Sequence, residues 1–198
     1  PKDIEAILKT EVCCGASKDK LLISIAAGIT TKYIENIVGK DVPVIRIMPN
    51  MAATIGESVS SISCGSAVTP ENMKLAKEIF LTIGDVIEVD EELVDAVTAI
   101  SGSGPAYFFY MIEALIEAGC AAGLKEDVAK SLVLKTALGS AKLLEILKEP
   151  PAILRSKVTS KGGTTEAAIK VFESNKFKNI IKDAVNAARA RSKELQKR

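Results

Sequence analysis

Hydrophobic and polar residues follow two different patterns along the chain, and the change falls near Asp90. Before it, short apolar runs typical of buried strands alternate with segments whose apolar residues recur at helical spacing. The runs that predict strands are residues 21–28, 42–48, 58–64 and 86–89. The segments that predict helices are residues 4–12, 30–38 and 69–83. This alternation indicates an α/β architecture, a mostly parallel sheet covered by helices. Polar and apolar residues alternate within the third strand, which predicts one wetter face.

After Asp90 the pattern is helical throughout, and no further strand is predicted. The predicted helices are residues 91–100, 106–122, 125–147, 151–158, 165–173 and 177–195. Residues 106–122 are apolar on nearly every side, and a helix of that kind must be buried all round. A helical domain of this size hardly encloses such a helix alone, so a second subunit is the expected cover. The fold class is therefore α/β followed by all-α, divided into residues 1–90 and 91–198.

Composition excludes several classes of function. The chain has 198 residues with 26 Lys+Arg against 25 Asp+Glu, so no strong field attracts nucleic acid or an anionic membrane. It has no histidine, the commonest general base and metal ligand. Its cysteines lack metal-site spacing, so no metal site is predicted. Three of them lie among small and apolar residues, which predicts buried, reduced thiols in a cytosolic protein: Cys14, Cys64 and Cys120. No apolar run reaches membrane-spanning length, and the polar start is unlike a signal peptide.

The segment from Val158 to Ile169 carries the clearest chemistry. It places Gly162 and Gly163 among four hydroxyl residues, directly before a predicted helix. Glycines allow a tight turn and close approach of a ligand, and the amides of a helix start suit a carboxylate or a phosphate. An ordinary loop followed by a helix cap gives the same pattern. The pattern alone therefore leaves both interpretations open.

A longer comparison adds to this. Residues 151–173 resemble the signature of pyrroline-5-carboxylate reductases throughout, with matches at Pro151, Leu154, Val158, Thr159, Ser160, Gly162, Gly163, Thr165, Ala168, Ile169, Phe172 and Glu173. Residues 23–30, 45–50 and 95–107 are also similar to segments of that family, and the match runs from Pro1 to about Gln196.

The resemblance implies an NADPH- or NADH-dependent reductase that converts the cyclic imine 1-pyrroline-5-carboxylate to L-proline, the last step of proline biosynthesis. It implies that residues 1–90 are the later part of a Rossmann dinucleotide-binding domain. Residues 91–198 would be a substrate-binding dimerisation domain that interlocks with a second subunit, with the active site at the interface. Assembly beyond a homodimer stays open.

Site residues follow by position from the resemblance. The substrate carboxylate would be held by Ser160, Gly162, Gly163 and Thr164. Thr165 would place its hydroxyl by the ring nitrogen, and Glu91 would lie near the substrate. The residues implied to contact the cofactor are Ile25, Ala26, Ala27, Met48, Pro49, Asn50, Ser103, Gly104 and Pro105. Hydride transfer to a C=N bond needs alignment more than a strong acid, so positioning is the main role expected of Thr165.

Some features depart from the family. Lys161 stands where proline is usual before the two glycines, and Lys157 replaces a polar residue that contacts the cofactor in some relatives. The chain contains no Gly-x-Gly-x-x-Gly turn and no initiator Met. We therefore expect a chain cut from something longer, with little or no reductase activity by itself. The sequence leaves the choice between NADH and NADPH open.

Two alternatives remain at this point. A 6-phosphogluconate-type dehydrogenase would share the architecture, but it usually carries a lysine on the long helix, and residues 106–122 contain none. The chain could also be a non-enzymatic helical oligomerisation module with a carboxylate-binding loop. A Gly-x-Gly-x-x-Gly segment upstream in the gene would favour the enzyme, and a different upstream domain would favour the module.

Overall fold

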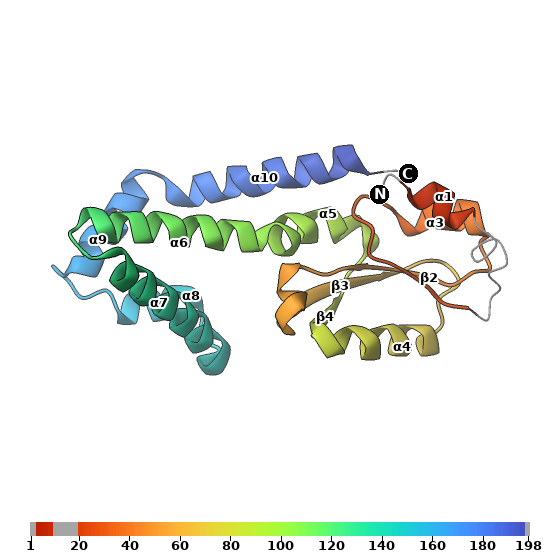
Figure 1. The fold of residues 1–198 in the computed structure, drawn as a ribbon, viewed down its shortest axis with the longest axis horizontal. Helices are drawn as coiled ribbons and strands as arrows, with labels where there is room; N and C mark the ends of the chain where they lie inside the picture. Colours follow the sequence, from red (N-terminus) through yellow and green to blue (C-terminus); the bar gives the residue numbers. More distant parts are fainter. Residues whose placement is uncertain (1–2, 10–19, 197–198) are drawn as a thin grey trace. The chain divides into compact units, whose positions relative to one another are not determined.

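The structure, a computed structural model, describes residues 3–9 and 20–196. The chain divides into two compact units (Figure 1). One contains residues 1–105 together with 184–198, and the other contains residues 106–183. The division falls within two long helices, α6 (Gly104–Ala121) and α10 (Phe177–Leu195). The domain boundary expected at residue 90 stays a prediction.

The first unit contains a sheet of four strands in the order β1-β2-β3-β4. These strands are β1 (Leu22–Ser24), β2 (Val44–Met48), β3 (Ser58–Cys64) and β4 (Gly84–Glu88). The β1–β2 and β3–β4 pairs are parallel, which confirms the mostly parallel sheet, but β2 and β3 are antiparallel. Residues 49–57 are too few for the crossover of about a dozen residues that a parallel neighbour needs.

Two details of the strands differ from the sequence-based predictions. Strand β1 ends at Ser24, because residues 26–29 form a turn in which the amide of Ile29 donates to the carbonyl of Ala26 (3.3 Å). The wetter face expected for β3 is wrong, since its serines are buried. Hydrogen bonding makes part of this burial possible: the Ser63 hydroxyl, for example, donates to the Val89 carbonyl (2.9 Å).

Apolar clusters cover both faces of the sheet. On one face, α1 (Ile4–Leu8) and α3 (Thr31–Val38) pack through Leu8 and Ile34 against Val44, together with Ile29 from the turn before α3. On the other, α4 (Pro70–Phe80) packs through Ala76 against Ile45, Ile47 and Ile62 (Figure 1). Successive β2 side chains alternate between these faces, as the pleat requires. Val12, predicted to extend the first helix, lies outside the described residues.

Helices follow the sheet, and the described residues beyond Asp90 contain no strand, as predicted. The expected helix 91–100 is three short segments: η3 (Glu91–Leu93), α5 (Val94–Val97) and the π-helical turn η4 (Thr98–Gly102). After α6 come α7 (Glu126–Leu147), α8 (Pro151–Lys157) and α9 (Thr164–Ser174), then α10. Short 3-10 turns η1 (Met51–Ile55) and η2 (Leu81–Ile83) flank β3 and β4.

A single chain leaves much of α6 and α7 uncovered. Three consecutive aromatic residues of α6 are 72%, 59% and 75% exposed: Phe108, Phe109 and Tyr110. On α7, Leu132 and Ile146 are among several exposed large apolar residues. Such a concentration marks an interaction surface, as expected for a helix that a second subunit covers.

The described cysteines are unpaired: Cys64 is exposed and Cys120 is half-buried. The predicted burial of Cys64 is therefore wrong, because it is the last residue of β3. Cys14 lies outside the described residues. Among the helices that the structure describes, none is long and apolar enough to cross a membrane. Nor do the described side chains form a cluster of three or more potential metal ligands.

Candidate active site

The loop between α8 and α9 presents a helix start without a side-chain cap. Helix α9 begins at Thr164, and its N-cap Gly163 has an extended backbone (φ −85°, ψ 171°) with no capping side chain. The first amides of a helix lack partners within it and carry the positive end of the helix dipole. These amides, at Thr164 and Thr165, suit an anionic group.

Each glycine of this loop has its own structural reason. Gly162 lies in the left-handed region (φ +75°), which other residues adopt at a cost. A Cβ atom at Gly163 would lie 2.5 Å from the Ser160 Oγ atom and 3.1 Å from the Ser160 carbonyl oxygen. The Gly163 amide donates to that same carbonyl (3.0 Å), closing a tight turn. The turn predicted from the glycine pair is present.

Glu166 is a loop partner that sequence reasoning missed. Its Oε2 atom accepts a hydrogen bond from the Gly162 amide (2.8 Å), and its Oε1 atom pairs with Lys170 (3.4 Å). The available signal was its place three residues after the N-cap, where an acid commonly reaches back to the loop. The Gly162 amide is therefore occupied by Glu166, and Gly162 supplies only its backbone conformation. The amides of Thr164 and Thr165 keep no partner among the described residues and stay available to a ligand.

The side chains around the loop divide into engaged and available groups. The Thr159 hydroxyl donates to the Arg155 carbonyl (2.6 Å). Lys157, one of the departures noted above, is held by both oxygens of Glu149 (2.7 and 2.6 Å). The hydroxyls left without a hydrogen bond to any described residue are those of Ser160, Thr164 and Thr165.

In the other unit, two of the predicted cofactor segments lie side by side. The β1–β2 register pairs Ser24 with Arg46, so residues 25–27 and 48–50 leave the same edge of the sheet. The carboxyl ends of parallel strands are where ligands of α/β sheets bind. Ile25 is 61% exposed, and the small side chains of Ala26 and Ala27 leave the backbone approachable.

Asn50 fixes the second of these segments. Its backbone amide donates to the Ser58 Oγ atom (3.2 Å), and its Oδ1 atom accepts from the Ala52 amide (3.1 Å). Its Nδ2 atom donates to the Ser101 Oγ atom (3.4 Å), which ties the segment to η4. These contacts, with the bond that the Asn50 carbonyl accepts from the Ala53 amide (3.1 Å), hold both the backbone and the side chain of Asn50 in place.

Residues 103–105 follow the π-helical turn. The Ser103 amide donates to the Thr98 carbonyl (2.8 Å), and Gly104 and Pro105 open α6. Proline is tolerated there because the first turn leaves its amides without helical partners. π-Helical turns are often found at functional sites.

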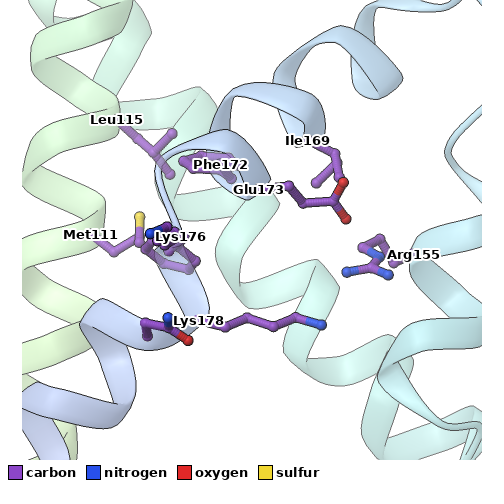
Figure 2. Close-up of a pocket in the computed structure, with 10 residues that line it drawn as sticks. Met111, Leu115, Arg155, Ile169, Phe172, Glu173, Lys176 and Lys178 are labelled. Atoms are coloured by element: carbon purple, nitrogen blue, oxygen red, sulfur yellow. The ribbon is translucent and has the colours of Figure 1, made fainter.

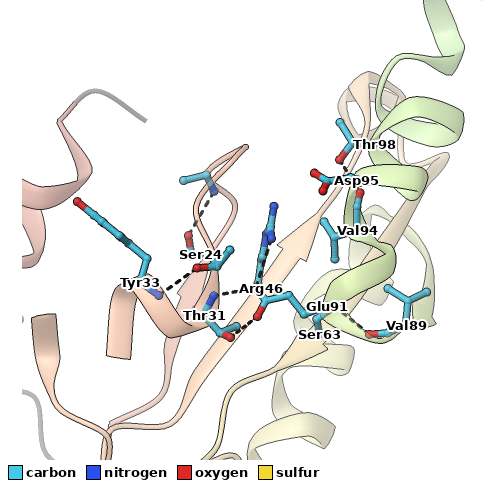
Figure 3. Close-up of polar contacts among 12 residues, drawn as sticks. Ser24, Thr31, Tyr33, Arg46, Ser63, Val89, Glu91, Val94, Asp95 and Thr98 are labelled. Carbon is cyan, nitrogen blue, oxygen red and sulfur yellow. Dashed lines mark hydrogen bonds and ion pairs between the residues drawn. The ribbon is translucent and has the colours of Figure 1, made fainter. Parts of the chain in front are cut away.

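Glu91 is held by two residues of the sheet unit (Figure 3). Its Oε1 atom accepts from the Thr31 amide (2.7 Å) and from the Arg46 guanidinium (3.3 Å), and its Oε2 atom accepts from the Thr31 hydroxyl. The predicted proximity of Glu91 to the substrate stays a prediction. Sequence reasoning missed Arg46, although it is a charged residue inside the apolar run of residues 42–48.

A separate cavity of about 650 Å³ lies in the helical unit (Figure 2). Its apolar wall includes Met111 and Leu115 of α6 and Phe172 of α9, and Arg155 lies on the opposite side. The ring centroids of Phe172 and Phe177 are 5.2 Å apart. None of the predicted site residues lines this cavity.

Comparison with known proteins places these features in a family. A family model described as pyrroline-5-carboxylate reductase dimerisation matches residues 91–195. A pyrroline-5-carboxylate reductase from Synechocystis sp. is 43% identical over 198 residues, which covers 100% of this chain and 73% of that protein. The chain belongs to the pyrroline-5-carboxylate reductase family. The resemblance inferred from residues 151–173 is confirmed.

Solved structures of pyrroline-5-carboxylate reductases agree over the whole chain. The enzyme from Coxiella burnetii is 37% identical with a TM-score of 0.88, covering 100% of this chain and 71% of that one. The pyrroline carboxylate reductase from Plasmodium falciparum, solved with NADP bound, is 33% identical with a TM-score of 0.91. That match covers 100% of this chain and 79% of the other. The predicted fold class, α/β followed by all-α, is confirmed.

Proposed function

We propose that this protein reduces 1-pyrroline-5-carboxylate to L-proline with NADPH or NADH, the last step of proline biosynthesis. The supporting observation is the similarity to pyrroline-5-carboxylate reductases along the entire chain, at 43% identity with the Synechocystis protein. The geometry of the α8–α9 loop is compatible with this chemistry, because the substrate carries a carboxylate. We also propose a cytoplasmic location, on the basis of the reduced thiols expected from the sequence.

The substrate carboxylate binds, in this proposal, at the start of α9. The amides and hydroxyls of Thr164 and Thr165 have no hydrogen-bond partner among the described residues, and the helix dipole favours a negative charge there. The Ser160 hydroxyl supplies a further donor. Glu166 stabilises the loop by accepting a hydrogen bond from the Gly162 amide, so the turn is already formed when the substrate carboxylate binds.

The cofactor binds, in this proposal, along residues 25–27, 48–50 and 103–105. Three features fit its nicotinamide end. Residues 25–27 and 48–50 lie at the carboxyl edge of β1 and β2, Ala26 and Ala27 have small side chains, and a Cβ atom at Gly104 would meet nothing within 4 Å. The cofactor, when bound, supplies the hydride. The role of the protein, in this proposal, is to align the cofactor with the imine carbon of the substrate and to keep water away from that carbon.

Thr165 has a positioning role in this account. A threonine hydroxyl is too weak an acid to protonate the ring nitrogen alone, and an imine nitrogen can arrive already protonated. The Thr165 hydroxyl orients that nitrogen or relays a proton from water, while its own amide points at the carboxylate. Orientation alone contributes much of the rate of such a two-reactant step.

A second copy of the chain is the proposed partner. The exposed aromatic residues of α6 lie within the segment that the dimerisation family matches. Burial of such residues drives association, so we propose a homodimer built on α6 and α7.

The test is oxidation of NADPH in the presence of 1-pyrroline-5-carboxylate. It would be measured for the chain by itself and for the chain preceded by a strand–turn–helix unit that carries Gly-x-Gly-x-x-Gly. Turnover in either form that falls by about 10-fold or more with Thr165→Ala supports the proposal, since lost positioning is costly. Absence of turnover in both folded forms contradicts it.

A further inference from the structure

Arg46 is a buried charge in an otherwise apolar strand. Its neighbours Val44, Ile45 and Ile47 are buried, and Arg46 itself is only 2% exposed. Its Nη1 atom lies 3.3 Å from the Glu91 Oε1 atom, and its Nη2 atom is buried without a hydrogen-bond partner among the described residues. A well-packed apolar side chain is often at least as stable at such a position. Stability alone therefore gives a poor account of this arginine.

Glu91 connects Arg46 to the start of α3 by hydrogen bonds. The same carboxylate that pairs with Arg46 accepts from both the amide and the hydroxyl of Thr31, the first residue of that helix. The Thr31 amide has no partner within the helix, so Glu91 satisfies it from 60 residues away in sequence. The helix also has its own cap, because the Thr30 hydroxyl accepts from the Tyr33 amide (3.0 Å).

The loop between Ser24 and Thr31 is thereby anchored at both ends. Ser24 pairs with Arg46 in the sheet, and Thr31 binds the carboxylate that Arg46 holds. Between these anchors lie residues 25–27, and Ile25 is 61% exposed. On its inner side, Gly28 has no room for a side chain, since a Cβ atom there would lie 2.7 Å from the Leu195 carbonyl oxygen.

We propose that Arg46 is a positioning residue that acts through Glu91 to fix the loop of residues 25–30. In the proposed function this loop contacts the cofactor, so the functional part of the inference rests on that proposal. Arg46 touches neither cofactor nor substrate. It determines how well the loop is preorganised, and a loop that must be ordered on binding lowers affinity.

The first experiment follows the loop without any ligand. Amide hydrogen exchange would be measured at residues 26–31 and, for comparison, at residues 58–64 of β3. The variants are Arg46→Met, Arg46→Lys, Glu91→Gln and the Arg46→Met/Glu91→Gln double variant. Glu91→Gln covers the case in which Arg46→Met does not fold. The control is Ile62→Val, which trims a fully buried residue of β3 and removes none of the contacts among Arg46, Glu91 and Thr31.

The inference predicts a local effect. Exchange at residues 26–31 accelerates by about 10-fold or more in Arg46→Met, the change expected for losing one charge-assisted hydrogen bond, while β3 changes far less. Arg46→Lys exchanges more slowly at residues 26–31 than Arg46→Met does. The double variant exchanges there no faster than Arg46→Met alone. Ile62→Val accelerates exchange in β3 at least as much as in residues 26–31. Equal acceleration of loop and β3 in the Arg46 and Glu91 variants, or additive effects of the two changes, would overturn the inference.

A second readout separates this inference from the proposed function. In the form of the chain that turns over, Arg46→Met should raise the KM for NADPH by about 10-fold, with a smaller change in the KM for the imine. A loop that loses protection while the KM for NADPH is unchanged keeps the positioning role and refutes the cofactor assignment of residues 25–27. A loop that keeps its protection refutes the role of Arg46 whatever the kinetics show.

Discussion

At the scale of single residues, the two loop glycines act differently. Gly162 supplies a left-handed backbone, and Gly163 leaves room for Ser160. Their presence before a helix was enough to predict the turn, because few other residues allow it. The place of Glu166 three residues after the N-cap was a usable signal for its bond to the Gly162 amide, but nothing in the sequence indicated that Arg46 is buried against Glu91. Arg46 and Glu91 are 45 residues apart and come together only in the folded chain.

Replacing Gly162 by alanine should weaken substrate binding. The left-handed backbone would cost about 1 kcal/mol, and the turn would shift away from its present geometry. We expect the KM for 1-pyrroline-5-carboxylate to rise by about 10-fold, since each lost charge-assisted hydrogen bond is worth about 1.5 kcal/mol or more. Steady-state kinetics and thermal unfolding measure the two effects.

Gly56→Ala is the matched control for that change. Gly56 has nearly the same φ (+76°), and a Cβ atom added at either glycine would meet nothing within 4 Å beyond its neighbours in the chain. The control should lose similar stability with an unchanged KM for the imine. Equal changes of KM in the two variants would show that loop geometry at Gly162 is unimportant for the substrate.

Cys64 provides a test of local electrostatics by its pH dependence. Partial burial raises the pKa of this thiol, the charge of Glu88 raises it further, and Lys77 lowers it. Less thiolate is therefore present at mildly alkaline pH than for an ordinary thiol. Glu88→Gln should lower the pKa and speed alkylation of Cys64, followed by mass spectrometry of its peptide.

The exposed acid Glu78, which pairs with Lys74 on α4, is the control for this effect. Glu78→Gln should leave the alkylation rate of Cys64 unchanged. A slower reaction in Glu88→Gln than in the parent chain would contradict the arrangement at the end of β3.

At the scale of elements, long periodic helices were predictable and short irregular segments were not. The bounds predicted for α7 and α10 lie within a residue of those observed, since apolar residues recur at helical spacing over the whole of each helix. The short connection of residues 49–57 was a usable signal for the antiparallel β2–β3 pair, but the early end of β1 and the π-helical turn had no clear signal. Tertiary contacts decide these features, whereas apolar spacing records only which side of an element is buried.

The exposed aromatic residues of α6 predict an effect on assembly. Phe108→Asp would place a charge on a surface that a second subunit buries, which costs several kcal/mol. We expect the dimer dissociation constant to rise by about 100-fold or more, measured by sedimentation. Asn36→Asp adds the same charge at an exposed position of α3 and should leave assembly unchanged. A dimer of undiminished stability in Phe108→Asp would exclude this part of α6 from the interface.

At the scale of the whole molecule, the two proposed binding regions belong to different units of the chain. The carboxylate-binding loop lies within residues 106–183, and the proposed cofactor segments lie within residues 1–105. Pattern and composition could predict the α/β and helical parts. The assignment of a reaction required the match of the whole chain to one family, because the same fold supports many reactions.

The most direct test compares two substrates, 1-pyrroline-5-carboxylate and 1-pyrroline, which lacks the carboxylate. The measurement is kcat/KM for both in the active form and in its Gly163→Ala variant, where the new Cβ atom would displace the turn at Ser160. We predict a preference of about 100-fold or more for the carboxylate substrate, as for sites whose buried donors need a partner. The variant should lose most of that preference while reducing 1-pyrroline nearly as before. Equal losses for both substrates, or no preference in the parent protein, would contradict carboxylate binding at the start of α9.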